Sequence, residues 1–206
     1  MKIRYILSSV ALASLSLTSC SDLDTAPEGN IITSDKKGEI LEEMPERGLA
    51  GVRAIFQGLS AYEPNYEAFG KIERHNDIGY PSVLMFTDAN TEDVVSDPNG
   101  YNWNENSLDY SDRTYTSYES QMVWNDHYNA IYVANTVIKG YNTGEDPTNE
   151  EARFFYAQGL AARAYFYFNL AQLYQFTYKD NETKPCIPVV TDENTAKSQV
   201  EGTPCS

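Results

Sequence analysis

The chain has 206 residues and a formal net charge of -15, with 30 acidic and 15 basic side chains. This excess of negative charge repels nucleic acid and anionic lipid, so we expect no nucleic-acid partner. Hydrophobic residues make up 41% of the chain and aromatic residues 13%, which excludes a disordered polypeptide and is sufficient for one hydrophobic core.

The first 20 residues have the pattern of a secretory leader. Lys2 and Arg4 precede the apolar run 6–17, and small residues follow up to Cys20. The run is shorter than the about 20 residues that a spanning helix needs. A cysteine at the cleavage site resembles the lipobox of bacterial lipoproteins, where it is lipidated and becomes the new N-terminus. We therefore predict a signal peptide over 1–19 and a lipid anchor on Cys20; the alternative is an ordinary secretory peptide with an incidental cysteine.

Residues 20–33 are predicted to form a lipidated polar tether. Asp22, Asp24, Pro27 and Gly29 give this segment the composition of a linker that holds a folded body away from the membrane. Acidic residues beside a lipidated cysteine resemble the surface-export signal of Bacteroidetes lipoproteins. This resemblance implies an outer-membrane protein that faces the cell exterior.

The folded body is expected to begin with two helical segments. Apolar residues recur at three- and four-residue steps over 34–62, with a break at Pro45 and a cleaner helix over 46–60. A second helix is predicted over 77–92, with Pro81 in its first turn.

The segment 96–117 shows no helical period and is predicted to be a long aromatic loop, which we take as the candidate ligand surface. Its rings could stack on pyranose faces, and its amide and carboxylate groups could bind sugar hydroxyls. The alternative is that the rings pack on the helices and hold the loop in place. The candidate ligand-binding residues are Tyr101, Asn102, Trp103, Asn104, Asp109, Tyr110 and Tyr115.

Two long helices are predicted next, over 118–141 and 149–176. The first has a broad apolar stripe that includes Trp124 and Tyr128, and the second begins at a capping-box sequence, 148–151. A short turn connects them, so we expect an antiparallel hairpin. The helical spacing of Trp124, Tyr128 and the aromatic residues of 154–168 assigns them to the core.

The C-terminal part of the chain is predicted to have irregular backbone structure. Residues 184–192 are predicted to be an extended loop, and 201–204 to lead into another helix capped by Thr203. Cys186 and Cys205 could pair outside the cytoplasm, but spacing alone leaves that question open.

No catalytic residue, metal site or cofactor is predicted. His75 and His127 belong to no cluster with metal-ligand spacing, and Asp126 is only the sequence neighbour of His127. The acidic run that starts at Asp88 lacks the glycine of a calcium loop. The chain also has no phosphate-binding loop, dinucleotide fingerprint or nucleophile elbow.

These landmarks, in this order, resemble the SusD/RagB family of Bacteroidetes nutrient-binding lipoproteins. The resemblance covers essentially the whole chain. It rests on the lipobox at 17–20, the acidic tether, Asp88 with 93–95, the 124–138 helix pattern, the 161–167 helix pattern, and the 187–191 segment.

The family resemblance implies a mainly α fold of tetratricopeptide-like hairpins with long irregular loops. It also implies a non-enzymatic lid on a TonB-dependent SusC-type transporter, which captures oligosaccharide or polysaccharide ligands for import. Family members are longer, so 34–206 is expected to be the N-terminal part of a truncated SusD-like domain. The alternatives are a peptide-binding member of the family, a surface carbohydrate-active enzyme, and a scaffold that binds another protein.

Overall fold

The computed structural model describes residues 33–60, 77–95, 100–101, 104–142, 144–191 and 202–204. This part of the chain is mainly helical, which confirms the predicted fold class. Its elements are α2 (Ser34–Glu43), the 3-10 helix η1 (Pro45–Gly48), α3 (Leu49–Ser60), α5 (Tyr80–Ala89), α6 (Glu105–Leu108), α7 (Tyr118–Tyr141), α8 (Glu150–Tyr174), β1 (Pro185–Pro188) and β2 (Gly202–Pro204).

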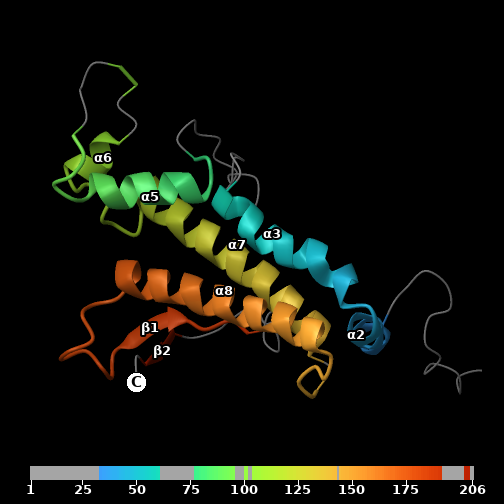
Figure 1. The fold of residues 1–206 in the computed structure, drawn as a ribbon. Helices are drawn as coiled ribbons and strands as arrows, with labels where there is room; N and C mark the ends of the chain where they lie inside the picture. The colour runs from blue at the N-terminus through green and yellow to red at the C-terminus, as the bar shows by residue number, and fades with distance from the viewer. Residues whose placement is uncertain are drawn as a thin grey trace, which may run out of the picture.

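The centre of the molecule is the antiparallel hairpin of α7 and α8, as the sequence predicts (Figure 1). The two helices approach closely where Gly159 of α8 faces α7, because a Cβ at Gly159 would lie 3.0 Å from Ile138 Cγ1. The buried face of α8 repeats at three- and four-residue steps, as expected for a helix packed along one side. It consists of Ala152, Phe155, Gly159, Ala162, Phe166 and Leu170.

Each helix of the hairpin begins at a side-chain cap. Ser117 Oγ accepts the Ser120 N–H at the start of α7, and Asn149 Oδ1 accepts the N–H groups of Glu151 and Ala152 at the start of α8. The cap of α8 is therefore Asn149, one residue after the threonine expected from the capping-box sequence. Thr148 instead contacts Glu42 of α2, whose Oε1 accepts the Thr148 N–H and hydroxyl and the Asn149 N–H.

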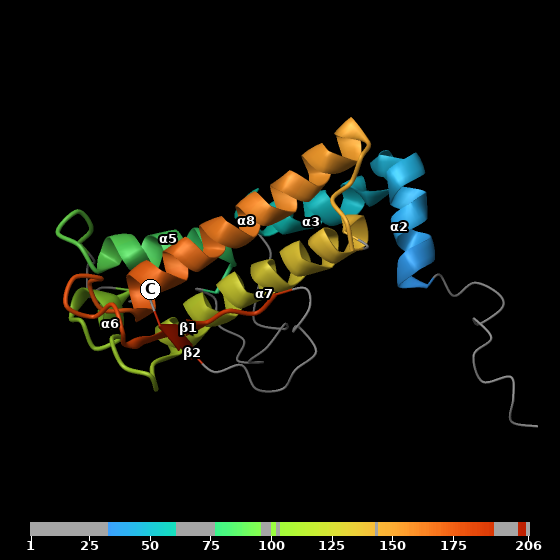
Figure 2. The same ribbon diagram turned by 90° about the horizontal axis from the view of Figure 1, so that it is seen from below.

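Helices α3 and α5 form a layer on one side of the hairpin, and α2 lies at the end where α7 meets α8 (Figures 1 and 2). The predicted break at Pro45 is confirmed, but α3 begins at Leu49 because Pro45 starts a 3-10 turn. Tyr141 donates a hydrogen bond to the Pro45 carbonyl at 2.8 Å. Gly48 makes room for that phenol, since a Cβ there would meet its oxygen.

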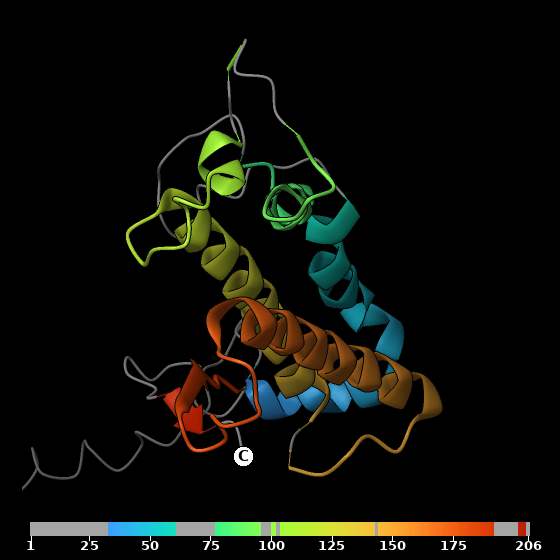
Figure 3. The same ribbon diagram turned by 90° about the vertical axis from the view of Figure 1, so that its left-hand side faces the viewer.

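A short antiparallel pair, β1 and β2, covers the opposite side of the hairpin (Figure 3). The extended backbone predicted for 184–192 is confirmed at 185–188, which pair as a strand rather than remain a loop. Residues 202–204, expected to lead into a helix, are a strand, and the positions where that helix would begin lie outside the described residues. Residues 202–204 pair with 185–188, and side chains of the hairpin bind the backbone at the end of β1 and just after it. Tyr128 donates to the Pro188 carbonyl at 2.7 Å, and Asn135 Nδ2 donates to the Val190 carbonyl at 3.0 Å.

The core assignment of the α8 aromatic residues is only partly correct. Phe155 and Phe166 are buried, whereas Phe154 is 62% exposed, Tyr165 45% and Phe168 64%. Helix α8 carries aromatic residues on more than one side, but neighbouring elements contact only part of its circumference, so the remaining rings face outward. Among the described residues, no helix combines the length and apolar character needed to cross a membrane.

Candidate functional site

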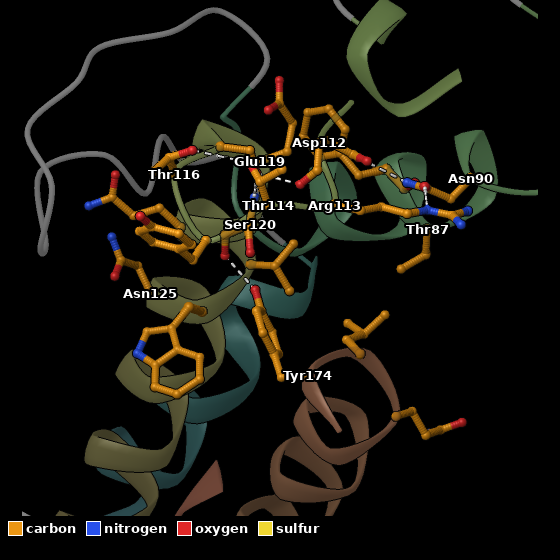
Figure 4. Close-up of a pocket in the computed structure, with 18 residues that line it drawn as sticks. Thr87, Asn90, Asp112, Arg113, Thr114, Thr116, Glu119, Ser120, Asn125 and Tyr174 are labelled. Carbon is orange, nitrogen blue, oxygen red and sulfur yellow. Dashed lines mark hydrogen bonds between the residues drawn. The ribbon is translucent and has the colours of Figure 1, made fainter. Parts of the chain in front are cut away.

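An open groove lies at the end of the hairpin where α7 begins and α8 ends (Figure 4). Its walls are the last turn of α5, the segment 112–117, the first half of α7 and residues 172–174 of α8. The groove has a volume of about 1080 Å³, slightly above the range of about 300–1,000 Å³ for small-molecule sites.

Aromatic rings form one side of the groove. Trp124 is half-buried and packs on Tyr128, with ring centroids 4.6 Å apart, and meets Tyr174 edge to face at 5.1 Å. Tyr174 donates its hydroxyl proton to the Ser120 carbonyl, and burial raises its pKa to about 12. The phenol therefore stays protonated and holds the end of α8 against the start of α7. Tyr115 stands at the rim and is 96% exposed.

Polar side chains form the wall beside α5. Asp112 Oδ2 accepts hydrogen bonds from Ser107 Oγ at 2.6 Å and from Asn90 Nδ2 at 3.0 Å. Asn90 Nδ2 also donates to the Phe86 carbonyl at 2.9 Å, which fixes the orientation of the amide on the last turn of α5. Arg113 Nε donates to Asn90 Oδ1 at 3.1 Å. This wall is therefore ordered by its own hydrogen bonds before a ligand arrives.

The structure brings one of the predicted ligand residues, Tyr115, into the groove. Tyr101 is 86% exposed and Tyr110 is 48% exposed, and neither lines it. Asn102 and Trp103 lie outside the described residues, as do Cys20, the leader, most of the tether and Cys205. The ligand role of these residues, the lipid anchor and the cysteine pairing therefore stay predictions.

The two remaining predicted residues act in local turns. The Asn104 carbonyl accepts the N–H groups of Ser107 and Leu108 in α6, a single helical turn that the sequence did not predict. Asp109 Oδ1 accepts the Ser111 N–H at 3.0 Å. Hydrogen bonds from Ser111 lower the pKa of Asp109, so this exposed carboxylate is charged.

Sequence reasoning missed the polar wall and placed Trp124 only in the core. The sequence does contain a signal for the groove, because Gln121 and Asn125 flank Trp124 on α7 and a purely buried face would not carry them. Asn90, Asp112 and Arg113 carry no such signal, since their proximity depends on how α5 packs on α7.

His127 and Asp126 lie outside the groove. The two side chains do approach, with His127 Nδ1 3.5 Å from Asp126 Oδ2, so Asp126 is more than the sequence neighbour of His127. The same nitrogen lies 3.0 Å from the Val123 carbonyl, and the ring is only 1% exposed between Tyr80 and Phe166. This is the geometry of a histidine packed in the core. Within the described ranges, no three histidine, cysteine or acidic residues are placed to hold a metal ion.

The fold and the groove define a mainly helical protein with a ligand-sized groove at one end of a helical hairpin. A sequence model of the SusD-like family, described as "Starch-binding associating with outer membrane", matches residues 78–203. The match covers more than half of the chain and includes every residue that lines the groove. The chain belongs to the SusD-like family. A comparison with curated proteins found no match.

Proposed function

We propose that this protein is a surface-exposed glycan-binding lipoprotein that captures nutrient oligosaccharides in the groove for import through a TonB-dependent SusC-type transporter. The observation that supports this function best is the groove itself, which places aromatic rings opposite hydrogen-bonding side chains. The description of the family supports a starch or related glycan as ligand and an association with the outer membrane.

The groove suits a sugar because a pyranose has an apolar face and a hydroxyl-bearing edge. Tyr115 and Trp124 offer flat apolar surfaces for the face, and Gln121, Asn125 and Gln172 offer donors and acceptors for the edge. Binding of this kind is reversible and breaks no bond, as a capture and transfer role requires.

Substitution of Tyr115 tests this function with little risk to the fold, because the side chain is almost fully exposed. We expect Tyr115→Ala to weaken binding of soluble oligosaccharides, neutral or acidic, measured by isothermal titration calorimetry. Tyr132→Ala is the matched control, since Tyr132 is a 54% exposed ring on α7 outside the groove. Equal affinities for the two variants, or no binding of any glycan by the unsubstituted protein, would refute the proposal.

The lipid anchor on Cys20 has a separate test. We expect Cys20→Ser to abolish incorporation of labelled palmitate in cells and to release the protein from the outer-membrane fraction, because a single cysteine at the cleavage site carries the acyl chains. Unchanged labelling of the serine variant would rule out this anchor.

A further inference from the structure

Arg113 is the one positively charged side chain among the residues that line the groove. It is exposed, and Figure 4 shows it beside Asn90 on the wall formed by α5. A cation at this place is notable because the chain has twice as many acidic as basic residues.

Neutral groups hold this guanidinium in place. Its Nε donates to Asn90 Oδ1 at 3.1 Å, and its carbon atom lies 4.0 Å from the centre of the Tyr110 ring. Asn90 is itself fixed by Asp112 Oδ2 and the Phe86 carbonyl. The position of the guanidinium is therefore set by an aromatic ring and an anchored amide, and no ion pair to Arg113 is present within the described part of the chain.

The two carboxylates of the groove are withdrawn from its surface. Asp112 is 7% exposed and Glu119 is 4% exposed. Asp112 accepts hydrogen bonds from Ser107 and Asn90, and Glu119 accepts one from Asn106 Nδ2 at 3.0 Å. Arg113 is consequently the charged side chain of the groove that a ligand can contact directly.

We propose that the groove selects sugars that carry a carboxylate, namely uronic-acid residues, and that Arg113 binds that carboxylate. The inference rests on the proposed glycan-binding function and adds the chemical class of its ligand. The two terminal nitrogens of an arginine match the two oxygens of a carboxylate in a paired geometry that lysine cannot reproduce. The net negative charge of the chain opposes an acidic ligand only over short range, because salt screens charges beyond about 8 Å at physiological ionic strength.

The test compares tetragalacturonate with its methyl ester, which has the same sugars and linkage but no charge. By calorimetry at physiological salt, we expect the acid to bind at least about tenfold more tightly than the ester. This is the difference in affinity expected for one hydrogen bond to a charged group. Arg113→Gln should remove this preference, and Arg113→Lys should keep only part of it. Arg153→Gln on α8, outside the groove, makes the same charge change and should retain the full preference.

Equal binding of acid and ester by the unsubstituted protein would overturn the uronate inference, and so would an unchanged preference in Arg113→Gln. If either result were accompanied by tight binding of maltoheptaose, the proposed glycan-binding function would still be supported. Failure of all these oligosaccharides to bind would overturn both proposals. Thermal unfolding of each arginine variant separates a loss of affinity from a loss of fold.

Discussion

One tyrosine hydroxyl satisfies both backbone groups of a residue 23 positions away. Tyr167 Oη accepts the Val190 N–H at 2.6 Å and donates to the Val190 carbonyl at 2.7 Å. Burial raises the pKa of Tyr167, so the proton that this second bond needs stays on the phenol. Asn135 also donates to the same carbonyl and accepts from Arg163 Nη1 at 3.0 Å. Residue 190 is therefore attached to both helices of the hairpin.

Removal of the Tyr167 hydroxyl should loosen the segment that follows β1. Tyr167→Phe leaves the Val190 N–H without its partner, so we expect faster hydrogen exchange at that amide and a loss of about 1–2 kcal/mol in the free energy of unfolding. Tyr132→Phe removes an exposed hydroxyl from α7 and serves as the control. Unchanged exchange at Val190 would show that the hydroxyl does not hold this segment.

The Glu42 carboxylate should make stability depend on pH at the α2 end of the hairpin. Its pKa is lowered chiefly by the hydrogen bond from the Thr148 hydroxyl. A lowered folded-state pKa means that the stabilisation is present above the ordinary value of 4.5 and is lost as pH falls through the folded-state value. We expect Glu42→Gln to be less stable than the unsubstituted protein at pH 7, with the gap closing in acid. A gap independent of pH in chemical denaturation would contradict this account.

Asp77 should have the opposite pH dependence. Burial raises its pKa, although Tyr118 donates a hydrogen bond to Oδ2 at 2.9 Å. The folded state therefore holds this proton to a higher pH than the unfolded chain, so the contribution of Asp77 to stability falls as pH rises from 3.8 through the folded-state pKa. The unsubstituted protein should accordingly gain stability relative to Asp77→Asn as pH falls through this range.

Denaturant titrations of the two Asp77 proteins at a series of pH values provide the measurement. Parallel stability curves for the unsubstituted protein and Asp77→Asn would show that the Asp77 pKa is the same in the folded and unfolded states.

The close approach at Gly159 should make that position intolerant of side chains. A Cβ there would lie 3.0 Å from Ile138 Cγ1 and 3.4 Å from Val137 Cγ1, so Gly159→Val should cost about 1–3 kcal/mol of unfolding free energy through overpacking. Ala161→Val on the exposed side of α8 places the same side chain where no neighbouring helix is met. Because valine is a better helix former than glycine and a poorer one than alanine, propensity alone would make Gly159→Val the less costly substitution of the two. A smaller loss of stability for Gly159→Val than for Ala161→Val would therefore mean that α7 and α8 do not pack this closely at Gly159.

The sequence predicted the hairpin well because the signals for it are local. The bounds of α7 follow from the Ser117 cap and an unbroken apolar stripe, and both are properties of neighbouring residues. The strands could not be predicted in the same way. β1 has four residues with a proline at each end. The backbone of 188–190 is held by Tyr128, Asn135 and Tyr167, which lie far away in the chain.

The groove was harder to predict than the fold for a related reason. Helical spacing shows that Trp124 faces other elements, but not that α5 and α8 leave a gap beside it. The polar wall depends on contacts such as Asn90 with Asp112, 22 residues apart, which no periodicity reveals. Among the predicted ligand residues that the structure describes, only the exposed Tyr115 lies in the groove.

The central claim, that the groove binds glycan, is tested most directly by the fluorescence of the two tryptophans of the chain, Trp103 and Trp124. Trp103→Phe leaves Trp124 of the groove as the sole reporter, and Trp124→Phe leaves Trp103 of the aromatic loop. We predict that malto- or galacturono-oligosaccharides produce a saturable change in the emission of Trp103→Phe. A change confined to Trp124→Phe would place the ligand at the aromatic loop and contradict binding in the groove.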